Sequence, residues 1–309
     1  MKKVLVTGGS GFIGSHTVEA LLEKEFEPIV LDNFSTGSRQ NIAHLPVQCI
    51  EADITHPETV DLIKQLAPDY IIHLAAQVSV AASVKDVLYD EEVNIKGSLQ
   101  VMKAASEAKV KRVVFASSAA VYGDPVYLPV DTEHRLQPGS PYGLSKLTVE
   151  RYLELFQSLY GLDYSILRYS NVYGPRQDAL GEGGVVSIFS DKFAKQEAPF
   201  IFGNGEQTRD FIYVGDLAAA NVAALTAQSN VCLNVSSGDS ITVNELFQTM
   251  KRVTKSHLEP IYKPERPGDI VHSTLANEKT KQVLAWEPVV SLQEGLTRTI
   301  SYYEQEVKA

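Results

Sequence analysis

Two residues that could move a proton stand four positions apart in the segment SPYGLSK, residues 140–146: Tyr142 and Lys146. Ser140 is a typical helix N-cap and Pro141 suits the first helical position, so a helix is predicted to begin here. Residues four apart on a helix share a face, and the phenol and the ammonium can therefore share one site. A free phenol has a pKa near ~10, but a neighbouring ammonium and the positive end of a helix both favour the phenolate. The spacing predicts that Tyr142 is a proton acceptor.

A proton acceptor of this kind needs a partner that holds the substrate oxygen, and the run KRVVFASS at residues 111–118 offers one. Its β-branched residues predict a buried strand, with Ser117 and Ser118 at its carboxyl end. Either hydroxyl is placed to hold a substrate oxygen near Tyr142. A tyrosine and a lysine one turn apart also occur on ordinary surface helices, so the assignment depends on the elements around them.

The elements that must position these residues alternate along the first half of the chain. Short β-branched runs are separated by amphipathic segments with helical periodicity. Such alternation predicts an α/β fold with a doubly wound parallel sheet, helices on both faces, and ligands at the carboxyl ends of the strands. The strands are predicted at residues 2–8, 27–32, 47–53, 69–76, 111–118 and 162–174.

The alternation ends after about residue 172, where Gly- and Pro-rich segments begin. We therefore predict a dinucleotide-binding domain of Rossmann type over residues 1–172 and a smaller C-terminal α/β substrate lobe over residues 173–309. Residues 214–237 contain a helix and a strand, and they are candidates to return to the large domain.

Composition excludes several classes of protein. The 309 residues carry a formal net charge of −10, which argues against binding to nucleic acid or anionic membranes, because these polyanions demand clustered Lys and Arg. Cys49 and Cys232 have no partners at metal-ligand spacing, so neither a disulfide framework nor a metal site is predicted. The apolar run after the first lysines is too short for a signal peptide, and no stretch reaches the ~18 apolar residues of a membrane span. We expect a cytoplasmic protein.

A glycine-rich turn follows the first predicted strand and opens a helix. Gly8, Gly11 and Gly14 allow a tight turn, the approach of a pyrophosphate to the backbone, and close packing of helix on strand. The helix N-terminus attracts the anion. Asp32 ends the next strand, where its carboxylate can accept hydrogen bonds from ribose hydroxyls and would repel a 2′-phosphate. The pattern predicts NAD rather than NADP, although Arg39 nearby could suit a phosphate.

Four segments, TGGSGFIG, HLAA, SSAAVYG and SPYGLSK, resemble the extended short-chain dehydrogenase/reductases of the nucleotide-sugar epimerase/dehydratase family. The likeness covers essentially the whole chain. It implies that Asp53 sits against the adenine and that Asn33, Ser35 and Thr36 line the adenosine end. Including the residues that the resemblance adds, the predicted NAD-binding residues are Gly8, Gly11, Phe12, Ile13, Gly14, Asp32, Asn33, Ser35, Thr36, Gly37, Asp53, Ile54, Leu74, Ala75, Ala76, Gln77, Asn94, Tyr142, Lys146 and Tyr169.

The resemblance also bears on the reaction. In this family the catalytic hydroxyl stands four residues before the tyrosine of VYG, here Tyr122, which selects Ser118 and leaves Ser117 as the alternative. Related dehydratases and decarboxylases carry an acid in the two positions after it. Here these are Ala119 and Ala120, which cannot move a proton. A ketone formed by hydride removal is then left to regain the hydride on its opposite face, so the resemblance implies a 4-epimerase with a 4-keto intermediate.

The resemblance to UDP-hexose 4-epimerases extends into the second half of the chain. It implies that Tyr169 lies near the nicotinamide and Asn171 at the substrate diphosphate. Two guanidiniums, Arg209 and Arg266, match the charge and fork geometry of a diphosphate, and Asp269 can accept hydrogen bonds from uridine ribose hydroxyls. The predicted substrate-binding residues are Ser79, Ser118, Tyr142, Asn171, Arg209, Arg266, Asp269 and Ser273.

Ser273 bears on the choice of sugar. In this family the residue a few positions after the GD pair abuts the sugar, and a bulky tyrosine there excludes N-acetyl groups. Counting along RPGDIVHS puts Ser273 at this place. Because serine is small, we expect UDP-N-acetylglucosamine and its galacto epimer to be accepted as well as UDP-glucose and UDP-galactose.

Four residues between positions 73 and 79 are interpreted separately. Val78 stands where some UDP-galactose epimerases have a lysine near the cofactor. Gln77 and Ser79 are expected to point toward the nicotinamide or the sugar instead. His73, on a buried strand end, is interpreted as a core histidine rather than a catalyst.

The resemblance further suggests a homodimer paired through helices. Tyr152, Leu153 and Phe156 on the catalytic helix are interpreted as packing residues that could contribute to such an interface. Two other interpretations of the whole chain stay open. One is a uronate epimerase or a dehydratase, and the other is a dinucleotide-sensing protein without chemistry, against which the intact catalytic trio argues.

Overall fold

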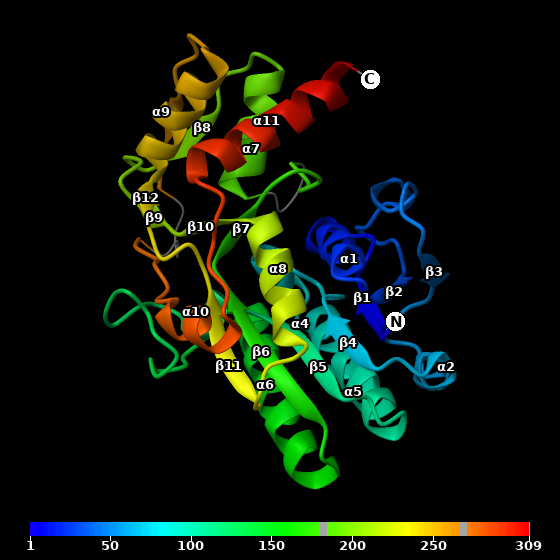
Figure 1. The fold of residues 1–309 in the computed structure, drawn as a ribbon. Helices are drawn as coiled ribbons and strands as arrows, with labels where there is room; N and C mark the ends of the chain where they lie inside the picture. Colours follow the sequence, from blue (N-terminus) through cyan, green and yellow to red (C-terminus); the bar gives the residue numbers. More distant parts are fainter. Residues whose placement is uncertain (180–183, 266–270, 309) are drawn as a thin grey trace.

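The computed structural model describes residues 1–179, 184–265 and 271–308 (Figure 1). A seven-stranded sheet with the order β11-β6-β5-β4-β1-β2-β3 forms its centre. All neighbouring strands in it are parallel, which confirms the predicted doubly wound α/β fold. The strands are β1 (Lys3–Thr7), β2 (Glu27–Asp32), β3 (Gln48–Glu51), β4 (Tyr70–His73), β5 (Arg112–Ser118), β6 (Asp163–Tyr169) and β11 (Val231–Val235).

Helices cover both faces of this sheet because its strands are apolar on both sides. On one face, Val18 of α1 and Leu217 of α8 share a core with Val6 and Val30 of the strands. On the other face, α2, α5 and α6 pack through residues such as Val101. These helices are α1 (Phe12–Glu23), α2 (Glu58–Leu66), α5 (Ser98–Glu107), α6 (Pro141–Tyr160) and α8 (Val214–Ala224).

Three short helical segments connect β4 to α5 and pack against α6. They are α3 (Val80–Lys85), α4 (Val87–Asp90) and the π-helical stretch η2 (Glu91–Gly97). They bring the segment after β4 close to the first turns of α6. This connection places the three segments against the helix that carries Tyr142.

The second half builds a separate apolar core around Phe189, Phe193 and Phe247, above the carboxyl edge of the sheet in Figure 1. Its two-stranded sheets pair β10 with β7, β12 with β9, and β13 with β8. Its elements are β7 (Asn171–Tyr173), α7 (Val185–Ala194), β8 (Phe200–Phe202), β9 (Thr208–Arg209), β10 (Phe211–Tyr213), β12 (Ile241–Thr242), α9 (Val243–Thr254), β13 (Ile261–Lys263), α10 (Glu278–Leu284) and α11 (Leu292–Lys308).

One segment of the second half joins the large sheet. β11 pairs with β6 at the sheet edge, and α8 lies beside α1, where the Asn221 amide donates to Thr17 Oγ1 (3.2 Å). Within the described ranges, no helix is long and apolar enough to cross a membrane.

The helix that carries Tyr142, α6, begins where the sequence predicts. Ser140 Oγ accepts a hydrogen bond from Gly143 N (3.1 Å), and Pro141 occupies the first turn of α6. The helix ends at Gly161, whose φ of 72° suits glycine. The cap fixes the first turn, which carries Tyr142.

Candidate active site

The glycine turn between β1 and α1 fits a dinucleotide. A Cβ on Gly14 would lie 2.0 Å from the Gly8 carbonyl oxygen, so helix and turn pack at a distance that only glycine allows. At Gly11 the nearest atom to an added Cβ is 3.3 Å away, and the outer face of the turn is left open. Among the described residues, no side chain caps the start of α1. Its first N–H groups are therefore available to an anion such as a pyrophosphate.

The next strand end supplies the predicted adenosine contacts. Asp32 accepts hydrogen bonds from Ser10 N and Phe34 N, each 2.8 Å, which fixes its carboxylate beneath the loop. Asn33 Nδ2 donates to Asp53 Oδ2 (2.8 Å). Burial raises the pKa of the Asp53 carboxyl, but hydrogen bonds from Thr55 and Asn33 more than offset this, and the net shift is downward. The two acidic residues are thus brought to one end of the site.

Several smaller residues complete this end. A Cβ on Gly37 would lie 3.1 Å from both carboxylate oxygens of Asp32, so the loop closes tightly there. Ser35 and Thr36 are exposed in the same loop, and Ile54 is buried against Gly97. Their contacts with NAD stay predictions.

Arg39, the residue that could have suited NADP, is engaged elsewhere. Its guanidinium donates to the Glu51 carboxylate and lies 4.1 Å from the centre of the Phe34 ring. The arginine is therefore held by an acidic partner, which leaves NAD as the better match to this pocket end.

The loop after β4 is tied to the segments beneath α6. Gln77 N donates to Asn94 Oδ1 (2.8 Å), and Gln77 Nε2 donates to Ser79 O and to Asp90 Oδ1, each 2.8 Å. Ser79 Oγ caps α3 by accepting from Ala82 N (2.8 Å). Both side chains are hydrogen-bonded within the protein. Their expected contacts with nicotinamide or sugar stay predictions. Leu74, Ala75 and Ala76 are half-buried, with the backbone of Ala75 against Gly8.

The structure brings Tyr142, Lys146 and Ser118 together at the carboxyl edge of β5. The Ser118 hydroxyl lies close enough to the Tyr142 hydroxyl to lower its pKa. Lys146 is buried, its Nζ lies 5.8 Å from the centre of the Tyr142 ring, and it donates to the Ala116 carbonyl (3.0 Å). A base, a hydroxyl and a cation therefore share one site.

The electrostatics of this trio differ from the prediction. Burial raises the pKa of Tyr142, and the nearby Ser118 hydroxyl, which lowers this pKa, does not offset the effect of burial. Burial also lowers the pKa of Lys146 to about 8. The sequence predicted that the ammonium and the helix end favour the phenolate, but the net shift of the Tyr142 pKa is upward, because losing water costs the phenolate more than the Ser118 hydroxyl returns.

The choice between the two serines is visible in the structure. Ser117 Oγ donates to Glu150 Oε1 (2.5 Å). Glu150 in turn holds Arg168 through two hydrogen bonds, at 2.9 Å to Nε and 2.6 Å to Nη2. Ser117 is thus part of a buried ion-pair network, and Ser118 faces the predicted proton acceptor.

His73 lies in the interior between two hydroxyls. Its ring nitrogens are 2.7 Å from Thr7 Oγ1 and 2.9 Å from Ser98 Oγ. Complete burial and the nearby Lys146 charge lower the pKa of His73 to about 3. It is a neutral, hydrogen-bonded core histidine, as the sequence indicated.

Tyr169 ends β6, and Asn171 begins β7 two residues later. The Tyr169 hydroxyl donates to Asn221 Oδ1 (2.6 Å) on α8, so its ring is held with its hydroxyl turned toward that helix. Asn171 Nδ2 donates to the Asp210 carbonyl (3.2 Å). Both residues lie at the carboxyl edge of the sheet, and their ligand contacts stay predictions.

Two of the predicted substrate residues on the second half of the chain lie on adjacent segments. Ser273 N donates to the Thr208 carbonyl (3.2 Å), which places the segment of Ser273 beside Arg209. The Arg209 guanidinium donates to the Thr208 carbonyl (2.8 Å) and borders a cavity of about 380 Å³. Arg266 and Asp269 lie outside the described residues.

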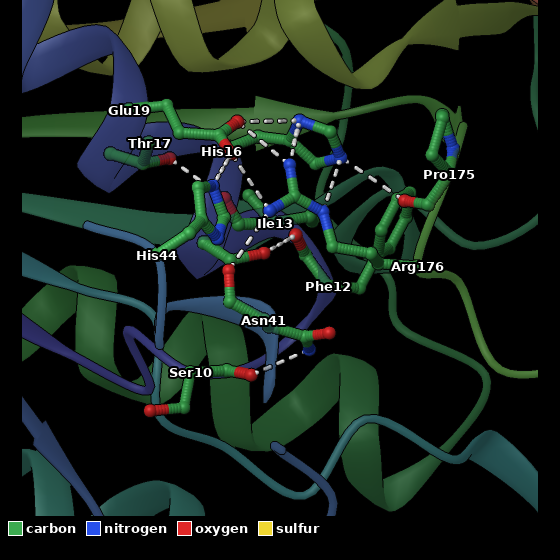
Figure 2. A network of polar contacts seen from close by, with 11 residues as sticks. Ser10, Phe12, Ile13, His16, Thr17, Glu19, Asn41, His44, Pro175 and Arg176 are labelled. Carbon is green, nitrogen blue, oxygen red and sulfur yellow. Dashed lines mark hydrogen bonds and ion pairs between the residues drawn. The ribbon is translucent and has the colours of Figure 1, made fainter. Parts of the chain in front are cut away.

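A second charged cluster ties the start of the substrate lobe to α1 (Figure 2). The Arg176 guanidinium donates to both Glu19 oxygens, at 2.9 and 2.7 Å, and to His16 Nδ1 (2.7 Å). His16 Nε2 lies 3.0 Å from the Pro175 carbonyl oxygen. Although burial raises the pKa of Glu19, bonds from His16 and Arg176 bring it down to about 2. The cluster anchors the loop after β7 to the helix of the glycine turn.

Sequence analysis missed Asp90, Glu150, Arg168 and Arg176. The sequence contains a signal for two of these residues, Arg168 and Glu150. Arg168 is a charge within the apolar strand ILRYS, which demands a buried partner, and Glu150 stands one turn after Lys146. Asp90 is four residues before Asn94, but nothing local shows that both become buried.

The open glycine turn and the buried tyrosine at the strand ends define the class, an α/β enzyme that works with a dinucleotide. The chain belongs to the NAD dependent epimerase/dehydratase family, whose model matches residues 4–235. This confirms the predicted family and NAD as its cofactor.

Solved structures agree over nearly the whole chain. It is 43% identical to a UDP-glucose 4-epimerase of Thermotoga maritima, described with UDP-glucose, with a TM-score of 0.95 and 99% of both chains covered. It is 37% identical to a UDP-N-acetylglucosamine 4-epimerase of Methanobrevibacter ruminantium in complex with UDP-N-acetylmuramic acid, with a TM-score of 0.94 and 99% of both chains covered. A UDP-glucose 4-epimerase of Thermus thermophilus in complex with NAD is 38% identical, with a TM-score of 0.90, and the match covers 97% of this chain and 98% of that one.

Proposed function

We propose that the protein is an NAD-dependent UDP-hexose 4-epimerase, an isomerase that interconverts UDP-glucose and UDP-galactose and the corresponding N-acetylated pair. The observation that carries this is the grouping of Ser118, Tyr142 and Lys146 in one site, at the strand edge that also bears the glycine turn. A base and a hydroxyl on one substrate oxygen are what oxidation of a secondary alcohol requires.

Each residue of the trio has a separate role in this proposal. Tyr142 takes the proton of the sugar hydroxyl and later returns it. Ser118 holds the sugar oxygen during both transfers, and Lys146 supplies positive charge that favours the phenolate. When bound, NAD supplies the hydride acceptor and donor.

The residues after Ser118 favour epimerisation over elimination. Ala119 and Ala120 form a short turn in which neither side chain can donate or accept a proton. Water loss from the sugar needs a group that protonates the departing hydroxide. Inversion at one carbon needs none beyond the trio.

The substrate lobe, residues 173–309 apart from 214–237, would bind the nucleotide. The neighbourhood of Arg209 and Ser273 supports a diphosphate site with a small residue next to the sugar. The relative from Methanobrevibacter ruminantium, named for the N-acetylated substrate, supports the broader sugar range. Arg266 and Asp269 complete this proposal from sequence alone.

Product analysis tests the function. The purified protein is incubated separately with UDP-glucose, UDP-galactose, UDP-N-acetylglucosamine and UDP-glucuronate, and products are identified by NMR. We expect the 4-epimer of the first three. A 4-keto-6-deoxy product would instead identify a dehydratase, and turnover of UDP-glucuronate alone would identify a uronate epimerase.

We further propose a homodimer that pairs through α6 and the neighbouring α3 and α4. Apolar side chains on these helices are exposed, with Leu88 79% and Leu159 61% accessible. Covering them would remove apolar surface from water. Analytical ultracentrifugation should give twice the mass of the 33.9 kDa chain, and the double substitution Leu155→Glu and Leu159→Glu should give the monomer.

A further inference from the structure

Asp90 is a buried carboxylate that the proposed reaction does not use. It ends α4, only 1% of it is exposed, and it lies beside the loop that follows β4. Its Oδ1 accepts from Gln77 Nε2 (2.8 Å) and from Asn94 Nδ2 (3.0 Å). A buried carboxylate costs several kcal/mol unless its surroundings compensate, so its presence here calls for a reason.

The two amides that bind Asp90 connect the loop after β4, residues 74–79, to α6. We call this loop the cofactor loop. Gln77 and Asn94 exchange two more bonds, from Gln77 N to Asn94 Oδ1 (2.8 Å) and from Asn94 Nδ2 to Gln77 O (3.0 Å). The two N–H groups of Asn94 Nδ2 are shared with a third acceptor, Ser145 Oγ (3.2 Å), and Ser145 Oγ donates to the Tyr142 carbonyl (2.9 Å). A continuous chain of hydrogen bonds therefore runs from Asp90 to the backbone of the proposed proton acceptor.

The charge of Asp90 also reaches the trio. It raises the pKa of Tyr142 and of Lys146, and for Lys146 it opposes burial, which is the larger influence and brings that pKa to about 8. From β4, His73 faces Lys146 as a neutral ring, since its pKa is about 3. From α3, Ser83 offers only a hydroxyl, which accepts from Tyr142 N (3.1 Å).

We propose that Asp90 is a positioning residue: it locks Gln77 and Asn94 so that the cofactor loop and the first turns of α6 keep one relative placement, and it is the negative charge that balances buried Lys146. The effect on turnover rests on the proposed function. The locking of the loop does not depend on it.

The first experiment removes the charge and keeps the shape. Asp90→Asn retains an acceptor oxygen for both amides. Because the charge of Asp90 raises the pKa values of Tyr142 and Lys146, its removal lowers both, and the whole profile of kcat/KM against pH should move toward acid by about one pH unit. Asp86→Asn is the matched control, since Asp86 is exposed at the start of the same helix, and its profile should coincide with wild type. An Asp90→Asn profile identical to wild type would overturn the charge role.

The second experiment needs no activity. Asp90→Ala removes the acceptor, and hydrogen exchange followed by mass spectrometry should show about tenfold faster exchange over residues 74–79 and 140–147, with α5 and β5 unchanged. Asp90→Asn should exchange as wild type does. Unchanged exchange in Asp90→Ala would overturn the positioning role, whereas a wild-type protein that epimerises no UDP-hexose would refute the proposed function and leave this result intact.

Discussion

The two halves of the molecule hold their polar residues in different ways. In the large domain, the predicted reacting groups stand at the end of a parallel strand and on a capped helix, and the elements that carry them are tied to the rest of the fold by buried side chains such as Glu150 and Asn94. In the substrate lobe, Arg209 stands on a strand of two residues, and the segment that carries Ser273 is joined to this strand by two backbone hydrogen bonds at Thr208. We infer from this difference that the proposed chemistry is fixed by the rigid elements of the large domain, whereas the proposed choice of sugar is made by short segments that can change separately.

The largest effect is expected at Gly14, where α1 packs most closely against the glycine turn. Gly14→Ala places a Cβ 2.0 Å from the Gly8 carbonyl oxygen, so α1 must move away from the turn. We expect no measurable NAD binding by calorimetry and a free energy of unfolding lower by about 1–3 kcal/mol. Gly139→Ala is the control, because nothing lies within 4 Å of its added Cβ. Wild-type NAD affinity in Gly14→Ala would show that the large domain is less rigid than proposed.

Removal of the Tyr142 hydroxyl tests the proposed proton transfer without changing the packing of the large domain. Tyr142→Phe should lower kcat by about 10²–10⁴-fold, the usual contribution of a proton-transfer group, while NAD binding and thermal stability stay near wild type. Tyr160→Phe, at the exposed end of the same helix, should leave kcat unchanged. If kcat survived in Tyr142→Phe, another base would have to be sought.

A substitution at Ser273 in the substrate lobe should alter the choice of sugar and little else. Ser273→Tyr is expected to lower kcat/KM for UDP-N-acetylgalactosamine by about 10–200-fold while UDP-galactose keeps most of its rate, because only the N-acetyl group needs the space. Ser273→Ala should keep both substrates. Equal losses for both sugars would place the size filter elsewhere.

The smallest effect concerns the link between the halves in Figure 2. Arg176→Met should lower the free energy of unfolding at neutral pH by about 1 kcal/mol, since the pair with Glu19 is partly exposed. The pKa of Glu19 is depressed to about 2, so this stability is present above its ordinary value near 4.5 and is lost as the pH falls toward 2. The difference between variant and wild type should shrink over that range. Arg39→Met, which breaks an exposed pair, should show no such trend.

Local sequence patterns were sufficient to predict the main elements of the large domain and most features of Tyr142, Lys146 and Ser118. The cap at Ser140, the first turn at Pro141 and the strand ending at Ser118 follow from residue types over a few positions. They could not give the pKa of Tyr142, because burial depends on packing from distant segments. The same limit explains Asp90 and the pair of Glu150 with Arg168, whose partners come from other elements of the fold.

The central claim is that the hydrogen on the inverted carbon leaves and returns inside one cavity while Tyr142 handles only the hydroxyl proton. Epimerisation of UDP-galactose in D₂O, followed by NMR of the product at the inverted carbon, tests this most directly. The account predicts protium at that carbon in every turnover. Deuterium accumulating there at the rate of epimerisation would contradict it.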